Sequence, residues 1–499
     1  MKQWTAPATA TALALVVGAP AQADVSAMQV WESWRAQAEA LGQTITAQTE
    51  VDGDTLRLTD VVTTFDGPDG TLTGTLDTLE FQERADGTVA ITLAPTYAFR
   101  MDMQDGTGTA QVDISVTHQG LAIIASGDAD AISYSYLADT IAATVDSLVV
   151  DGVQQDATIA FTVSDMTGDY SVAGTDAPEI AGTITAGAIG VVIAGTDAED
   201  GTVVDIRLDY AGVEATTDSV LAMMDSNDMA AMLAAGFSVG AEMLHGPASV
   251  AVAVQDGDEM FNLNMTMEGG SFYTALGADG MAYDIGAVGL DAAVSGSEIP
   301  FPELTASVDE LGFGFDMPVQ ATDTPSDFSA DLTLAGLTVA DMLWMIVDPG
   351  QNLPRDPATL IVALSGQGNW LFDIMDPELQ DNPPAGPPGE LHALSLDDLT
   401  LSLVGARLTG TGAFTFDNSD LETFDGLPAP TGGIDLQLVG GQGLLDKLVG
   451  MGLVPEDQAM AARMMLGLFA RPGDGPDTLT SKIEVRGDGA ILANGQRLQ

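Results

Sequence analysis

The sequence contains no cysteine among its 499 residues. Disulfides, thiolate metal sites and thiol nucleophiles are therefore excluded, and so is the lipidated N-terminal cysteine of bacterial lipoproteins. Basic residues are also scarce, since 14 Lys and Arg stand against 73 Asp and Glu and give a formal net charge of −59. A surface of this sign repels nucleic acids and anionic lipid headgroups, which bind clustered Lys and Arg. We therefore expect no nucleic-acid partner, and we interpret the acidity as a source of solubility in salty surroundings.

Histidine is limited to His118, His245 and His392, and none of them lies within metal-ligand spacing of another. The sequence has no Gly-x-Ser-x-Gly elbow, no P-loop and no dinucleotide fingerprint. Paired carboxylates are frequent, but a glycosidase needs them about 5 to 10 Å apart in space, which a sequence does not specify. We therefore predict a non-enzymatic protein with no catalytic residues, no cofactor-binding residues and no metal ligands. A carbohydrate-active enzyme is kept as an alternative, for which five Trp and seven Tyr offer few stacking surfaces.

Long apolar runs are missing as well, so we predict no transmembrane span, which requires about 18 residues. The first residues instead have the pattern of an export signal. Lys2 supplies a positive start, residues 10–17 form a short apolar stretch, and Ala21-Gln22-Ala23 is a small-residue cleavage site. We predict a signal peptide over residues 1–23, cleavage after Ala23, and a periplasmic or extracellular mature protein.

Most of the remaining chain alternates apolar and polar residues in short runs separated by Gly and Asp. The clearest example is 394–417, where Leu399, Leu401 and Leu403 precede a turn at Val404-Gly405 and the alternation resumes at Leu408. This pattern predicts a β-hairpin with one apolar face. We expect a mainly β protein with ancillary helices, built from antiparallel strands in one long or two stacked curved sheets. A parallel β-helix is the alternative architecture.

Two short segments near the start and in the second half have helical spacing. Residues 26–41 place Trp31 and Trp34 on one face and begin with capping-box residues, and we interpret the tryptophans as a plug on a sheet. Residues 338–347 begin with Thr338 and Asp341 at capping-box spacing and have apolar residues all round the axis. A helix of that kind is buried or contacts something apolar.

Further helical patterns divide the chain. We predict a helical region from Asp218 to His245, ended by Gly246-Pro247, and a helical pair near 441–470 whose second member starts at Pro455. The predicted organisation is a β-rich half over 24–245, with helices at its start and end, and a β-rich half over 246–499. The two halves are candidates for a duplication.

Two constellations suggest ligands. Closely spaced aspartates in turns suit calcium, at Asp52 and Asp54, Asp128 and Asp130, Asp256 and Asp258, and Asp417 to Asp420, although ordinary turns explain them as well. Methionine, with 22 residues, is concentrated in the helices, where it predicts a core packed on the sheet or a surface that accepts varied hydrophobic ligands; we favour the core. These methionines are residues 223, 224, 229, 232, 342, 345, 451, 460, 464 and 465.

Three stretches carry a family resemblance: VSAMQVWESW follows the export signal, DGDTL starts a strand at Asp52, and a helical pair precedes KIEVRGDGAILANGQRL at the end of the chain. In these stretches the chain resembles the secreted alphaproteobacterial proteins grouped as domain of unknown function family 2125. The ending is also similar to envelope proteins with long curved sheets, including relatives of the AsmA group, for which lipid handling between membranes has been proposed. The resemblance implies no catalytic residues.

These observations favour an exported, non-catalytic envelope protein that binds lipid or another hydrophobic partner in an apolar groove. A structural or adhesive protein that uses its acidic loops with calcium is the second hypothesis.

The excess of acidic residues predicts that salt stabilises the fold, because counterions screen the repulsion between carboxylates. We expect the melting temperature to rise between dilute buffer and seawater-like salt. An unchanged melting temperature over that range, measured by circular dichroism, would contradict this interpretation.

Overall fold

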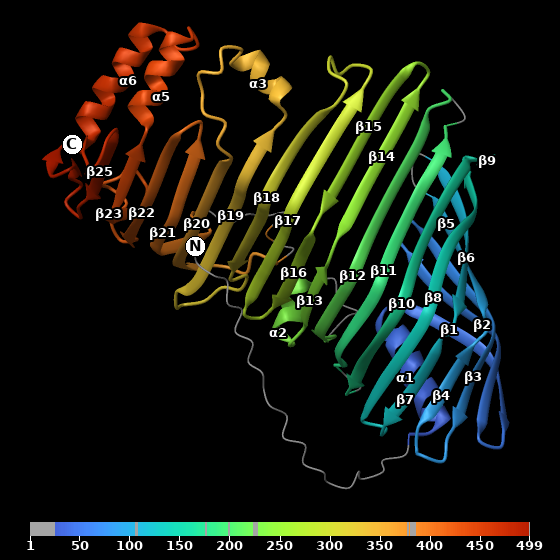
Figure 1. The fold of residues 1–499 in the computed structure, drawn as a ribbon. Helices are drawn as coiled ribbons and strands as arrows, with labels where there is room; N and C mark the ends of the chain where they lie inside the picture. The colour runs from blue at the N-terminus through green and yellow to red at the C-terminus, as the bar shows by residue number, and fades with distance from the viewer. Residues whose placement is uncertain are drawn as a thin grey trace.

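The computed structural model describes residues 25–104, 108–174, 177–197, 200–222, 228–376, 379 and 386–498. The predicted signal peptide lies outside them. Within these residues, 27 strands form one antiparallel sheet that is long and curved (Figure 1). The predicted fold class is therefore confirmed. The alternative of a parallel β-helix is wrong, because every paired strand runs antiparallel to its partner and all the strands belong to one sheet.

The strands follow the alternating segments of the sequence closely. Strands β1 to β12 are Gln43–Asp52, Thr55–Gly67, Gly70–Glu83, Val89–Leu93, Thr96–Gln104, Thr109–Gln119, Ala122–Gly127, Ala131–Val150, Val153–Gln154, Asp156–Ala173, Glu179–Thr196 and Val203–Val220. Strands β13 to β27 are Ser238–His245, Ala248–Asp256, Glu259–Met267, Gly269–Gly277, Gly280–Gly296, Leu304–Met317, Ser326–Val339, Ala358–Trp370, Gly389–Leu403, Ala406–Asp417, Ala429–Val439, Arg471–Pro472, Thr478–Val485, Ile491–Ala493 and Gln496–Arg497. The hairpin predicted at 394–417 is β21 and β22.

The sheet is a meander in which consecutive strands are neighbours. Four positions in the sheet are each occupied by two short strands that lie end to end. Thus β4 and β5 both pair with β3, and β6 and β7 both pair with β8. The same arrangement occurs again with β13 and β14 on β12, and β15 and β16 on β17. The sheet is thus continuous across residues 245 and 246, where the sequence suggested a division.

A line of irregularities crosses the middle of the long strands. Two of the breaks fall at Pro95 and Pro247, where the missing amide hydrogen interrupts the ladder. Elsewhere on this line a left-handed residue forms the irregularity; Gly336, with φ of +71°, packs so closely on Asp309 that an added Cβ would lie 2.0 Å from a carboxylate oxygen. Other residues with positive φ on this line are Asp60, Gly120, Asp165, Gly212 and Gly289. Such irregularities bend strands and increase their twist, which curves the sheet.

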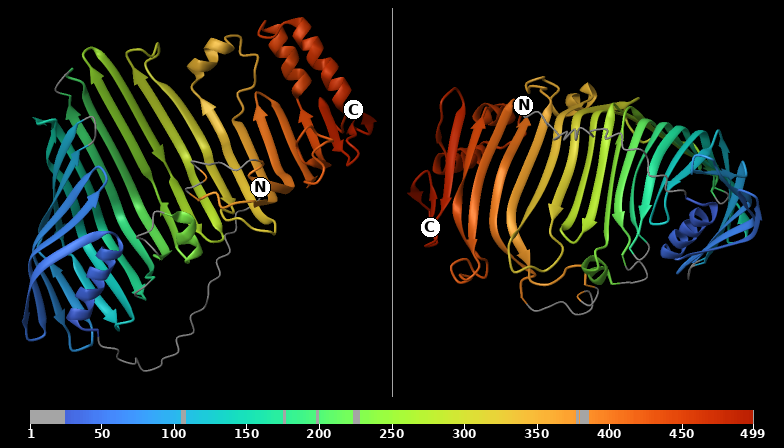
Figure 2. Two further views of the ribbon diagram at one scale, coloured as in Figure 1. Left: turned by 180° about the vertical axis from the view of Figure 1, so that it is seen from behind. Right: turned by 90° about the horizontal axis from the view of Figure 1, so that it is seen from below.

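The helix α1 (Ala27–Ala40) lies inside the bend of the N-terminal strands (Figure 2). Its predicted capping box is present. The backbone amide of Gln29 donates to the Ser26 hydroxyl at 3.3 Å, and the backbone amide of Ser26 donates to Gln29 Oε1 at 2.8 Å. Trp34 lies 5.4 Å from the ring of Phe81 and 6.2 Å from that of Tyr134. The tryptophans therefore form the plug that the sequence predicted, in a core that also contains buried residues of β2, β3, β4 and β8.

Two of the helical predictions need correction. Among the described residues of 218–245, only α2 (Met229–Ala234) is helical, because β12 continues to Val220 and β13 occupies Ser238–His245; Met223 and Met224 lie outside the described residues. The isolated apolar residues of 238–245 belong to an alternating strand. The helix α3 (Asp341–Val347) starts at Asp341 without a side-chain cap, and Thr338 belongs to β19, where its hydroxyl hydrogen-bonds Ser307 at 2.6 Å. The predicted pair is confirmed as α5 (Gly441–Gly450) and α6 (Glu456–Phe469).

Topology places the helices on two different edges of the sheet. The helices α3 and α5 follow β19 and β23, which run in the same direction because four antiparallel steps separate them. We call the edge where these strands end the helical edge; α3, α5 and α6 project from it (Figure 1). The helix α2 lies at the opposite edge.

The core around α1 predicts a difference between two phenylalanines of the same sheet. Phe81 is 0% exposed, so Phe81→Ala should lower the free energy of unfolding by about 3 to 5 kcal/mol. Phe161 is 42% exposed on β10, so Phe161→Ala should cost well under half of that. Urea titrations followed by circular dichroism measure both values, and equal losses would contradict the assignment of the core.

Candidate apolar binding face

Register assigns the apolar residues of successive strands to one face, because directly paired residues point to the same side of a sheet. One row of paired residues crosses nine neighbouring strands of the sheet, from β11 to β21. It consists of Ile184, Ala215, Met243, Phe272, Ile285, Phe313, Leu332, Val362 and Leu399. A second row on the other side of the line of irregularities consists of Phe161, Val191, Leu208, Val250, Met265 and Ala292. We call the surface that carries both rows the apolar face.

The two rows belong to one surface. A cluster around Val163 and Val213 joins them, since it includes Ile189 and Tyr210 from one side of the line of irregularities and Met243 from the other. The same surface continues into the core at α1, where Tyr170 and Ile180 pack. The apolar face therefore runs from the N-terminal bend to the C-terminal strands.

The residues immediately next to the first row point to the opposite face, and they are mostly polar. They are Thr183, Thr216, Glu242, Tyr273, Asp284, Gly314, Asp331, Ala363 and Asp398. The alternation therefore gives the sheet one apolar and one polar side, as the sequence predicted for individual hairpins.

Much of the apolar face is open to solvent. The helix α1 covers one end of it, and α2 with Val319 covers part of one margin. Between these covered parts, large side chains of the face remain between 38 and 44% exposed: Phe161, Ile184, Ile193, Phe261, Ile285, Phe313 and Leu332. Monomeric proteins rarely expose continuous apolar surface of this kind unless it binds something.

A cavity of about 420 Å³ indents the apolar face near the edge opposite α3. Phe315 and Phe328 line it from β18 and β19, and Trp370 lines it at the end of β20. The Trp370 indole donates a hydrogen bond to the carbonyl of Pro318 at 2.6 Å, which fixes the ring beside the cavity. The size is within the range of small-molecule sites. The sequence alone does not predict this site, because Phe315, Phe328 and Trp370 lie on three strands that only the fold makes neighbours.

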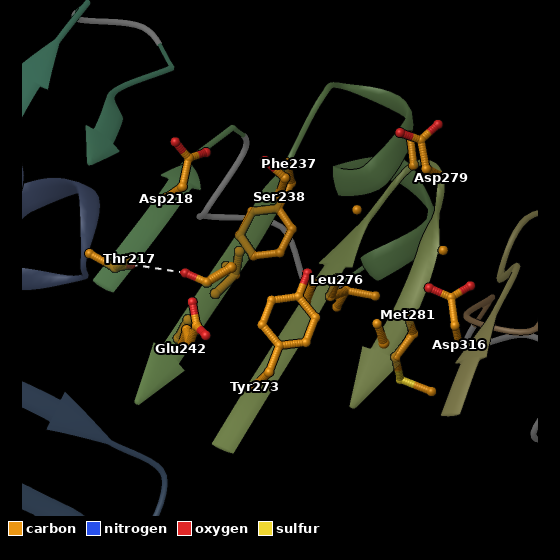
Figure 3. A pocket seen from close by; sticks show the side chains of 18 of the residues that line it. Thr217, Asp218, Phe237, Ser238, Glu242, Tyr273, Leu276, Asp279, Met281 and Asp316 are labelled. Carbon is orange, nitrogen blue, oxygen red and sulfur yellow. Dashed lines mark hydrogen bonds between the residues drawn. The ribbon is translucent and has the colours of Figure 1, made fainter. Parts of the chain in front are cut away.

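A larger hollow of about 720 Å³ lies around the ends of β12, β13, β16 and β17 (Figure 3). Its lining includes Asp218, Glu242, Asp279 and Asp316, with the Tyr273 ring between them. The four carboxylates are spread around the hollow and do not converge on one point (Figure 3). Among the described residues that line it there is no Lys, Arg or His, so we do not assign an acid–base pair to it.

The three histidines are far apart in the fold and each has a local partner. His118 Nε2 lies 3.0 Å from the Ala94 carbonyl, His245 Nδ1 lies 2.7 Å from the Gly246 carbonyl, and His392 Nε2 lies 2.8 Å from Asn369 Oδ1. The candidate calcium turns are local too, since Asp128 and Asp417 accept hydrogen bonds from the backbone of their own turns. In the described ranges, no group of three or more His, Asp or Glu is placed to hold a metal ion.

The methionine-rich helices divide into two kinds. Met232 of α2 is buried against the sheet, as a core helix requires. In α6, by contrast, Met460, Met464 and Met465 are each more than half exposed, and so is Met345 of α3. The prediction that these helices pack their methionines into the core is therefore wrong for α3 and α6, because both stand at the helical edge beyond the ends of the strands. In the part of the chain that the structure describes, no helix is both long and apolar enough to cross a membrane.

Comparison with known proteins gives one match. The model of a family described as an uncharacterized protein conserved in bacteria (DUF2125) matches residues 241–497. No curated protein and no solved structure matches the chain.

The polar face predicts a pH effect at Asp284, which flanks Gly314 together with Asp331. Burial raises the pKa of the Asp284 carboxyl, and the charge of Asp331 raises it further. A carboxyl whose pKa is raised in the folded state stabilises the fold most below its ordinary pKa of about 3.9, and this contribution is lost as the pH rises through the raised value. Asp284→Asn should therefore raise the melting temperature at pH 7, with a smaller gain near pH 3.

The matched control is Asp205→Asn on the same face. A hydrogen bond from Arg207 lowers the pKa of Asp205, so its charged form favours folding and its replacement should not stabilise the protein at pH 7. A pH-independent effect of Asp284→Asn on the melting temperature would contradict the assignment.

Proposed function

The chain belongs to the DUF2125 family, and on that premise we propose that it is an exported, non-catalytic envelope protein that binds lipid or a similar hydrophobic molecule along the apolar face of its sheet. The observation that carries the proposal is the unbroken row of apolar residues from Ile184 to Leu399, in which four large side chains are exposed to water: Ile184, Ile285, Phe313 and Leu332. Water is a poor solvent for such a surface, at a cost of roughly 25 cal/mol for each Å² of apolar area.

The shape of the face favours a long, flexible apolar ligand. The row of apolar residues crosses nine neighbouring strands. Because adjacent strands are about 4.8 Å apart, the row is long enough for an extended acyl chain. Val, Ile, Leu and Phe line it, and these side chains offer contact without hydrogen-bonding partners that a polar ligand would need. Each buried methylene contributes about 0.8 kcal/mol, so a chain of ordinary fatty-acid length binds such a surface usefully.

The cavity at Trp370 indents the apolar face and provides a first anchoring position. It is lined almost entirely by carbon atoms of Phe315, Phe328, Trp370 and neighbouring residues. The net charge of −59 favours ligands whose polar end is neutral, zwitterionic or cationic, because an anionic headgroup would be repelled.

Export fits this proposal, since a protein that handles lipid in the envelope must leave the cytoplasm. The predicted signal peptide over residues 1–23 supports that compartment.

The test compares two neighbouring residues of β14 that point to opposite faces. Val252 lies on the apolar face between Ile206 and Leu263, whereas Ala253 pairs with Asp205 and Asn262 on the polar face. Val252→Asp should weaken uptake of a pyrene-labelled phosphatidylcholine by delipidated protein by about tenfold or more, because a carboxylate would have to be buried beneath the ligand. Ala253→Asp should leave uptake unchanged. Pyrene fluorescence titration measures both.

Lipid extraction and mass spectrometry of the protein purified from the envelope give an independent measurement. We expect co-purifying amphiphiles with acyl chains. A wild-type protein that carries no apolar molecule and takes up no pyrene lipid would overturn the proposal, as would equal losses in the two variants with unchanged melting temperatures.

A further inference from the structure

The helix α6 presents four of its large apolar side chains to solvent. Met460, Met464 and Leu468 recur every four residues and form an outward stripe, which Met465 widens. Ala459 is fully buried on the other side of the helix. Folding alone would favour the opposite arrangement, because it gains most by burying the larger side chains.

The helix α3 shows the same feature. Met345, Ile346 and Val347 are consecutive and each is more than half exposed, although its first turn is held in place by Asp341, which pairs with Arg355 at 2.5 Å. The Arg355 guanidinium also lies 5.9 Å from the Trp344 ring centroid. The exposed residues therefore form the last turn of a helix whose first turn is anchored. Both helices stand on the helical edge, at the same end of the strands (Figures 1 and 2).

Charge distinguishes this part of the chain from the remainder. Residues 441–499 contain seven acidic and six basic residues, a net charge of −1, whereas residues 1–440 contain 66 acidic and eight basic residues. On α5 and α6 themselves, Arg463 pairs with Asp446. Electrostatic repulsion from a phospholipid headgroup layer is therefore weaker for the C-terminal region than for the remainder of the chain.

The helical edge is also continuous with the apolar face. The first residue of α5, Gly441, lies so close to Leu438 that an added Cβ would be 2.5 Å from its side chain. Leu438 pairs with Leu408, which pairs with Leu401, so all three lie on the apolar face. The apolar face therefore reaches the end of β23 where α5 begins.

From the exposed stripe, the neutral charge and the continuity, we propose that α6 and α3 dock the protein onto the surface of a lipid bilayer. The methionines of α6 and Met345, Ile346 and Val347 of α3 insert among the headgroups, with the sheet standing away from the membrane. Short amphipathic helices with an apolar face bind bilayers in this way. Docking rests on the proposed function for its purpose, since it would bring the apolar face to its lipid, but its test does not depend on lipid uptake.

The test is flotation of the full-length protein with zwitterionic phosphatidylcholine vesicles at physiological salt. Wild-type protein should float, and the double variant Met460→Glu, Met464→Glu should partition at least about tenfold less, because two exposed apolar anchors become charged. Both residues are highly exposed, so the melting temperature should not change. The control is Leu427→Glu, since Leu427 is 68% exposed at the edge opposite the helices, and this variant should float like wild type.

Two further measurements separate the outcomes. Uptake of the pyrene lipid from solution should be unaffected in the α6 variant, whereas Val252→Asp should lose uptake and keep flotation. If the wild type does not float, or if the α6 variant floats normally, docking is overturned while the lipid-binding proposal stands or falls by the uptake experiment. Analytical ultracentrifugation of each protein gives the third outcome. If the wild-type protein sediments as a dimer and the α6 variant as a monomer, the stripe joins two copies of the chain and the proposal is overturned.

Discussion

The register between neighbouring strands is the constraint on which the rest of this molecule depends. Side chains alternate with a period of two, so a shift by one residue between any two strands would transfer the apolar residues of one of them to the polar side. Left-handed residues such as Gly336 and Asp165 lie where strands skip a position, and the apolar rows continue on both sides of them. The skips therefore bend the sheet without mixing its two faces.

A single layer of sheet buries less apolar surface than a sandwich, so backbone hydrogen bonds supply much of its cohesion. The most extensive core lies in the N-terminal bend, where α1 brings Trp31 and Trp34 against Phe81 and Tyr134. Elsewhere the apolar side is left partly exposed, and a bound ligand would supply the missing second layer. The proposed function and the incomplete core are thus two aspects of one arrangement.

The sequence allowed much of the fold to be predicted, because alternation and turn residues are local signals. The hairpin at 394–417, the capped helix at Ser26 and the pair at 441–470 follow from spacing alone. The region before His245 was misjudged, since its apolar residues suit a helix or a strand equally and the partner strands decided between them. The exposure of Met464 and the cavity at Trp370 depend on which strands become neighbours and where the helices stand, and neither is encoded within a few residues.

The meander also has a consequence for how such a chain folds and how it can vary in size. Most strands pair with a strand that lies only one or two elements earlier in the chain, so loop closure is inexpensive and contact order is low for an all-β architecture. Folding can start at the compact end around α1 and advance towards the C-terminus one strand at a time. Because two added strands widen a sheet by about 10 Å, gain or loss of a hairpin would change the span of the molecule in fixed steps while leaving the other pairings intact.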